Sequence, residues 1–161
     1  MALAALGITA LAGSEFVHAG PRLVWNASPS APLGLYWVAH DDPLVHGALV
    51  LTALPESMRA LAAGRGYLPA GVPLVKRVAA LAGDTVCGAG ASLSIDGEVV
   101  ARRLATDRQG RPLPAWNGCR MLAAGEVFLL MEGVPDSFDG RYFGPVEASA
   151  IIGRLVSLWT W

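Results

Sequence analysis

The sequence predicts a mainly β fold, a single β-rich domain with one or two short helices. Three observations support this class. A length of 161 residues suits one domain with a real core. The 19 glycines and 11 prolines are scattered without a repeat, as expected of many turns between short strands. Asp96-Gly97, a dipeptide preferred in two-residue hairpin turns, lies between two short strand-like runs.

The expected strands are short apolar or alternating runs bounded by turn signals. A helix is expected over 55–63, because Pro55 stands at its start, a glutamate follows, and Gly64 lies just past its end. Residues 102–120 and 137–145 are expected to be loops. The strands, in order, are 23–25, 34–38, 48–52, 74–80, 92–95, 98–101, 126–131 and 150–159.

Composition narrows the function classes. The net charge is -1 and no basic stripe is present, which argues against a nucleic-acid partner. Two cysteines cannot form a zinc site alone, and the three histidines are far from them in the sequence, so a zinc site is not expected. Cys87 and Cys119 either form a disulfide, worth roughly 3–4 kcal/mol in the chain-entropy model, or remain buried free thiols.

The N-terminal residues 1–22 are a candidate membrane anchor or signal-like segment, ahead of a β-rich domain over 23–161. Residues 2–13 carry no charge, but this run is shorter than the roughly 20 apolar residues of a spanning helix. It also lacks the basic stretch that opens a signal peptide. A packed N-terminal helix is the alternative interpretation.

Lys76 is the only lysine of the chain, and the other eleven of the 12 basic residues are arginines. In a strand over 74–80, side-chain alternation places Lys76 on one face with Leu74, Val78 and Ala80. An ammonium on an apolar face is unstable unless it is paired or loses its proton. A lysine can become a neutral base there, whereas an arginine cannot. The alternative is a side chain that extends from the strand edge to solvent.

A neutral lysine could activate a serine hydroxyl, as in Ser-Lys dyads. Ser30 is a candidate nucleophile because Pro29 and Pro32 restrict the backbone around it. Ser28 could stabilise an oxyanion beside the backbone N–H of Ser30. Since loops rich in serine and proline are usually only loops, this segment alone does not decide the question.

Three motifs resemble the conserved boxes of the TraF-like conjugal-transfer peptidases, which are relatives of the type I signal peptidases. Residues 26–36 (NASPSAPLGLY) are similar to the serine box, 76–84 (KRVAALAGD) to the lysine box, and 137–145 (SFDGRYFGP) to the third box. They occur in the family's order, and the only lysine falls on the base position. The resemblance covers about residue 23 to the C-terminus.

Two departures from ordinary signal peptidases favour the TraF-like branch. A single residue, Ala31, separates the serine from the next proline, where those enzymes have two. Residues 133–136 (GVPD) stand where they carry Gly-Asp-Asn.

This resemblance implies a signal peptidase I-like fold and a serine endopeptidase that needs no metal or organic cofactor. Ser30 would be the nucleophile, Lys76 the general base, and Ser28 a contributor to the oxyanion site.

The third motif would supply the support for this dyad. Ser137 would orient the lysine amine, and Asp139 would form an ion pair with Arg141 that holds the motif against the site. A direct role for Asp139 is left open. Taken alone, residues 139–141 would be a solvated turn.

The implied substrate is an exported precursor, a conjugative pilin, cut at the periplasmic face of the bacterial inner membrane or in the periplasm, with a linear or cyclised product. An oxidising compartment would favour the disulfide. The alternatives are a general type I signal peptidase, a self-cleaving repressor-type peptidase, and a non-catalytic module of the conjugation or secretion apparatus. The repressor type would need an N-terminal DNA-binding domain, for which the residues before Asn26 are too few and too uncharged.

Overall fold

The computed structural model describes residues 20–161, so the candidate anchor lies outside the described residues except for its last three. Within 20–161 the elements are mainly strands, and no helix there is long and apolar enough to cross a membrane. The helices are α2 (Glu56–Gly64) and α3 (Gly140–Phe143), with a 3-10 turn η1 (Ala148–Ala150). The strands are β1 (Leu23–Asn26), β2 (Gly34–Ala39), β3 (Leu49–Thr52), β4 (Leu74–Ala80), β5 (Thr85–Ala89), β6 (Ser92–Ile95), β7 (Glu98–Arg102), β8 (Gly118–Met121), β9 (Glu126–Leu130), β10 (Val146–Glu147) and β11 (Ile151–Thr160).

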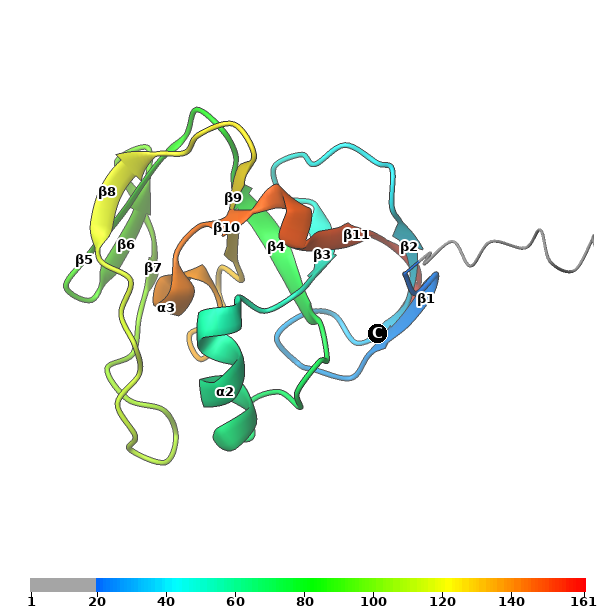
Figure 1. Cartoon of the computed structure of the whole chain (residues 1–161), viewed down its shortest axis with the longest axis horizontal. Coiled ribbons are helices and arrows are strands. Elements are labelled where there is room, and N and C mark those ends of the chain that lie inside the picture. The colour runs from blue at the N-terminus through cyan, green and yellow to red at the C-terminus, as the bar shows by residue number, and fades with distance from the viewer. Residues whose placement is uncertain (1–19) are drawn as a thin grey trace, which may run out of the picture.

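The strands form two antiparallel sheets (Figure 1). The larger has the order β1-β2-β11-β3-β4-β9-β10, and the smaller has the order β7-β6-β5-β8. The last strand, β11, is inserted between β2 and β3, so the C-terminus lies beside β1. The two sheets are joined where β4 continues into β5, and again where β8 leads into β9.

A mainly β fold with two short helices is confirmed, and most expected strands are present within a residue or two at each end. The β6–β7 hairpin turns at Asp96 and Gly97, both with positive φ (49° and 87°), because this turn needs two left-handed residues. The interpretation of 102–120 as loop was wrong at its end, where β8 pairs with β5. The expected loop over 137–145 contains α3.

The larger sheet positions the lysine. On β4 the side chains alternate, with Leu74, Lys76, Val78 and Ala80 buried. The strand is flanked by β3 on one side and β9 on the other, so it lies inside the sheet. The Lys76 side chain therefore cannot extend around a sheet edge to reach solvent, because strands flank β4 on both sides.

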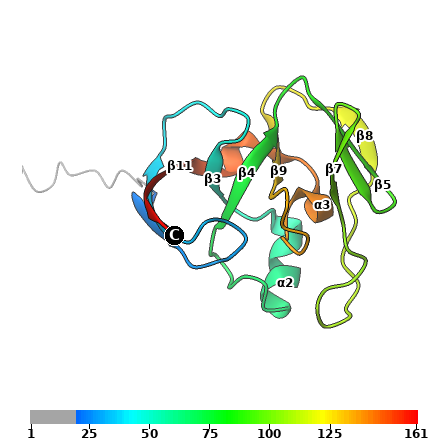
Figure 2. The same cartoon turned by 180° about the vertical axis from the view of Figure 1, so that it is seen from behind.

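A long connection between β7 and β8, residues 103–117, runs beside α2, as the two opposite views show (Figures 1 and 2). Hydrogen bonds join them: Arg65, which ends α2, donates to the Pro112 carbonyl (2.7 Å), and Arg111 donates to the Arg65 carbonyl (3.2 Å). This connection therefore forms a wall of the cavity described below.

Candidate active site

Lys76 is buried in the larger sheet, with only 3% of its surface exposed. Burial lowers the pKa of its amine to about 8, the negative charge of Asp139 partly offsets this, and Arg141 adds to the decrease. The amine donates a hydrogen bond to the hydroxyl of Ser137 (3.1 Å). A substantial fraction of this lysine is therefore neutral near pH 8. Extension of Lys76 to solvent, the alternative, was wrong.

The third motif is held by a buried ion pair rather than a solvated turn. Asp139 is fully buried and Arg141 is 2% exposed. The Asp139 carboxylate accepts hydrogen bonds from Arg141 Nε and Nη2 (2.8 and 2.7 Å), from the Arg141 backbone N–H, and from the Met131 N–H (3.1 Å). It also caps the first turn of α3. All its contacts thus orient the backbone around Ser137.

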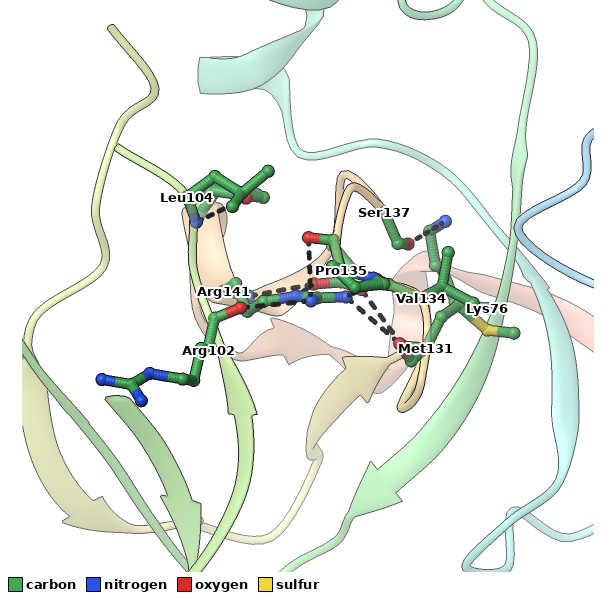
Figure 3. A network of polar contacts seen from close by, with 10 residues as sticks. Lys76, Arg102, Leu104, Met131, Val134, Pro135, Ser137 and Arg141 are labelled. Atoms are coloured by element: carbon green, nitrogen blue, oxygen red, sulfur yellow. Dashed lines mark hydrogen bonds and ion pairs between the residues drawn. The ribbon is translucent and has the colours of Figure 1, made fainter. Parts of the chain in front are cut away.

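Arg141 ties together the segments that surround Ser137. Figure 3 shows its guanidinium between Arg102 on one side and Met131, Val134 and Pro135 on the other. It donates to the carbonyl oxygens of Met131 (3.1 Å), Val134 (2.7 Å), Pro135 (3.2 Å) and Arg102 (3.4 Å). The loop that carries Ser137 is therefore fixed from β9 to the end of β7. A buried arginine with this many partners is strongly destabilising to remove, because the partners would lose their hydrogen bonds.

The serine loop between β1 and β2 is organised by Asn26. Its side-chain amide donates to the carbonyl oxygens of Ser28 (3.0 Å), Ala31 (3.1 Å) and Pro32 (3.0 Å), and its oxygen accepts from the Ser28 N–H (3.1 Å). Asn26 is 5% exposed. The sequence prediction credited the prolines alone and missed this residue. The asparagine directly before the turn was the signal that could have found it.

The two serines lie close together at this loop. The hydroxyls of Ser28 and Ser30 are 3.0 Å apart, and the Ser30 N–H donates weakly to the Ser28 hydroxyl (3.5 Å). Ser28 is exposed and Ser30 is half-buried. The Ser28 oxygen thus lies within reach of both the Ser30 hydroxyl and the Ser30 N–H, the group that would bind an oxyanion.

Ser28, Ser30, Lys76 and Ser137 line one cavity of about 960 Å³. Their hydrogen bonds form two separate pairs, Ser28 with Ser30 and Lys76 with Ser137. No direct hydrogen bond joins Ser30 to Lys76 in the described part of the chain. Catalytic hydrogen bonds are often long in the substrate-free state and shorten when substrate binds. The structure therefore brings the serine and lysine motifs to one space without joining them.

The cavity is supported from the smaller sheet as well. Trp116, at the end of the 103–117 connection, packs against Gly144, the last glycine of the third motif, and against Gly88 of β5. A Cβ at Gly144 would lie 2.4 Å from the Trp116 ring, and one at Gly88 would lie 2.7 Å from the Trp116 carbonyl oxygen. Both positions need glycine for this contact.

A disulfide fixes the adjacent strands. Cys87 on β5 stands directly opposite Cys119 on β8, and the structure contains the bond between them. Of the two states that the sequence left open, the structure thus has the disulfide. Cys87 is next to Gly88, and Cys119 is next to Gly118, the first residue of β8; a Cβ on either glycine would meet Trp116. The bond therefore secures the strand to which the 103–117 connection returns.

Comparisons with known proteins place these motifs in a family. The family model described as "Signal peptidase, peptidase S26" matches residues 1–161. A plasmid transfer protein TraF from Escherichia coli is 35% identical over 94% of this chain and 89% of its own length. A probable conjugal transfer protein TraF from Sinorhizobium fredii is 37% identical over 84% of this chain and 76% of its own.

A solved signal peptidase I from Enterococcus faecalis aligns with a TM-score of 0.41 at 19% identity, covering 71% of this chain and 98% of that chain. The family model spans all three motifs, and the TraF relatives cover most of the sequence. The chain belongs to the signal peptidase (peptidase S26) family and is similar to the TraF proteins of conjugal transfer.

Proposed function

We propose that this protein is a serine endopeptidase with a Ser30–Lys76 dyad that processes an exported precursor, a conjugative pilin, for the conjugation machinery. The observation that carries the proposal is the buried Lys76 amine, whose pKa is lowered to about 8, in the same cavity as the Ser30 hydroxyl. Family membership and the TraF relatives support the peptidase class and the link to conjugation.

The chemistry follows from the positions of these groups. Substrate binds extended in the cavity and brings its carbonyl carbon to Ser30. The neutral Lys76 amine takes the Ser30 proton as the hydroxyl attacks, which requires the side chains to close the gap between them. The Ser30 N–H, with the Ser28 hydroxyl, stabilises the oxyanion. The Lys76 ammonium then donates its proton to the leaving amine.

The group that attacks the acyl-enzyme determines whether the product is linear or cyclic. Attack by water gives a linear chain, whereas attack by the substrate's own amino terminus gives a cyclic one. The two products differ in mass by one water, because transpeptidation adds none. In both cases Lys76 takes a proton from the attacking group.

The proposed location is the periplasmic face of the bacterial inner membrane. The disulfide supports an oxidising compartment. A second observation supports contact with a membrane surface. Four of the five tryptophans of the chain are exposed on the outer face of β1, β2 and β11 or at the adjoining C-terminus. Tryptophan is enriched at membrane–water interfaces. These four are Trp25, Trp37, Trp159 and Trp161.

The test is co-expression with the pilin precursor from the same genetic element, read by intact mass. Wild type should give a processed product, while Ser30→Ala and Lys76→Ala should each leave the precursor intact with the enzyme still folded. Lys76→Arg should also be inactive, since arginine cannot accept the proton. Normal processing by Lys76→Arg would exclude the general-base role.

A general type I signal peptidase is the second candidate, favoured by the description of the family model. A panel of unrelated preproteins separates the two. Cleavage of many of them at their signal peptides would support the general enzyme, and cleavage of the pilin precursor alone would support the dedicated one.

A further inference from the structure

The cavity has a second, charged wall that the proposed chemistry does not use. It is formed by the 103–117 connection, the residues that follow α2, and Asp136 in the loop after β9. Three arginines and two aspartates line it, in addition to the dyad. They are Arg65, Arg108, Arg111, Asp107 and Asp136. Which of these charges are already neutralised decides what the wall can bind.

Asp107 and Arg111 neutralise each other. Arg111 Nε donates to the Asp107 carboxylate (2.6 Å), and the Tyr67 hydroxyl and the backbone N–H groups of Gln109 and Arg111 donate to it as well. Burial of Asp107 disfavours its charge, but these hydrogen bonds outweigh that effect and hold its pKa well below the usual range. Asp107 therefore stays ionised, and its charge is committed to Arg111.

Arg65 has no carboxylate partner among the residues that the structure describes. Its Nη1 donates to the Pro112 carbonyl (2.7 Å) and weakly to the Tyr67 hydroxyl (3.4 Å). Both acceptors are neutral. The remaining N–H groups of its guanidinium are free to donate to a ligand, because an arginine carries five donors. The Tyr67 hydroxyl connects Arg65 to Asp107, the neighbour of Arg108, so the two arginines belong to one wall.

Arg108 forms only an exposed ion pair. It contacts Asp136, and the two side chains are 85% and 39% exposed. Exposed pairs of this kind contribute little, so an incoming carboxylate can replace Asp136 without a large loss. Asp136 immediately precedes Ser137, the partner of Lys76. Arg108 is thus tied to the segment that positions the base.

We propose that Arg65 and Arg108 form a subsite for a carboxylate of the substrate polypeptide. The carboxylate comes either from an aspartate or glutamate side chain or from the C-terminus of the substrate. This inference rests on the proposed peptidase function, because it assumes that a polypeptide occupies the cavity. Arginine suits the role, since its planar fork binds both oxygens of a carboxylate.

The experiment measures binding without cleavage. Full-length protein with Ser30→Ala is titrated into fluorescent ten-residue peptides of alanine, glycine and serine, read by anisotropy. One series moves a single glutamate along an amidated peptide, with a glutamine counterpart at each position. A second pair compares a free C-terminal carboxylate with an amide. The first series detects an acidic side chain, and the second pair detects a chain end.

The expected result is that one carboxylate position, or the free C-terminus, binds about tenfold more tightly than its neutral counterpart. Adding Arg108→Gln or Arg65→Gln should remove this preference. Adding Asp136→Asn should strengthen it, because Arg108 is then free. Arg108→Glu should reverse it in favour of a lysine peptide, which general loosening of the loop would not do.

Arg120→Gln is the matched control, because Arg120 pairs with Glu126 and does not line the cavity. The subsite would be overturned if every carboxylate peptide bound as tightly as its neutral counterpart. It would also be overturned if no peptide bound at all. Survival of the preference in both arginine variants would do the same. None of these results touches the proposed function, which depends on precursor cleavage by the Ser30 enzyme.

Discussion

The Lys76 amine donates to the Ser137 hydroxyl at 3.1 Å, and both groups are buried to 3% exposure. The hydroxyl fixes one N–H direction of the amine and so limits where the lone pair of the neutral form can point. Asp139 and Arg141 do not contact the amine, but they hold the backbone on which Ser137 stands. In this arrangement Ser137 orients the Lys76 amine, and Asp139 helps to position Ser137.

Ser137→Ala should lower kcat by roughly tenfold to a hundredfold, because the amine loses the contact that orients it. Ser137→Thr keeps the hydroxyl and should retain most activity. Both variants should fold, with a loss of about 1 kcal/mol in unfolding free energy for the alanine. Single-turnover cleavage of the pilin precursor measures the effect. Full activity of Ser137→Ala would remove Ser137 from the mechanism.

The pH dependence of cleavage should follow deprotonation of Lys76. Since burial lowers the pKa of this amine to about 8, kcat/KM should rise with pH and level off above that value. Ser137→Ala should shift the midpoint, whereas the exposed-face variant Arg120→Gln should not. A profile that is flat between pH 6 and about 9 would contradict a lysine base.

Lys76→Met should stabilise the fold at neutral pH. The folded-state pKa lies below the unfolded value of 10.5, so the unfolded state binds more protons between the two values. Wild-type stability should therefore rise as pH increases from about 8 to 10.5, and be lowest below pH 8. The pKa shift of Lys76 corresponds to about 3 kcal/mol of destabilisation below pH 8. Lys76→Met removes this destabilisation but also removes the hydrogen bond to Ser137, which contributes about 1 kcal/mol. The net gain in unfolding free energy should therefore be about 2 kcal/mol. Urea unfolding at pH 6 and 10 tests this, and a variant less stable than wild type at pH 6 would contradict it.

The disulfide should stabilise the smaller sheet. Because the cysteines are separated by 32 positions, reduction should lower the unfolding free energy by about 4 kcal/mol in the chain-entropy model. Denaturation with and without reductant measures this, and a Cys87→Ser/Cys119→Ser variant should be insensitive to reductant. Loss of activity on reduction, without global unfolding, would show that the 103–117 connection depends on the bond.

The outer face of β1, β2 and β11, with its exposed tryptophans, should contact lipid if the protein works at a membrane surface. In vesicles with brominated acyl chains, the emission of the exposed tryptophans should be quenched. Trp116→Phe removes the half-buried tryptophan and isolates the signal of the other four. A chain that sediments with vesicles but shows no quenching would place its attachment elsewhere.

The sequence predicted the strand around Lys76 with its full bounds, because local alternation and flanking turn residues suffice for a central strand. It missed β5 and β8. Thr85–Ala89 contains a glycine and a cysteine, and β8 is exposed along its length, so neither has an apolar pattern. β5 forms by pairing with β6 and β8, and β8 forms by pairing with β5. The pairing of β8 with β5 is long-range information that local propensity does not contain.

Four of the predicted site residues, Ser28, Ser30, Lys76 and Ser137, line one cavity, yet the sequence could not reveal the pairing inside it. That Ser30 contacts Ser28 while Lys76 contacts Ser137 depends on backbone placement across β1, β4 and the loop after β9. The buried state of Asp139 and Arg141 was also hidden, because a charged turn is normally solvated. Only the tertiary contacts of Arg141 with four carbonyl oxygens explain it.

The packing of Trp116 against Gly144 links two segments that lie far apart in the sequence. Gly144 closes the third motif, whereas Trp116 belongs to the connection that walls the cavity. A larger residue at 144 would be tolerated only if the indole were replaced by something smaller, and its φ of 76° adds a second constraint. An exchange of the 103–117 connection to alter substrate choice should therefore include Trp116. An exchange that replaces Trp116 would lose the contact with Gly144 and should fail.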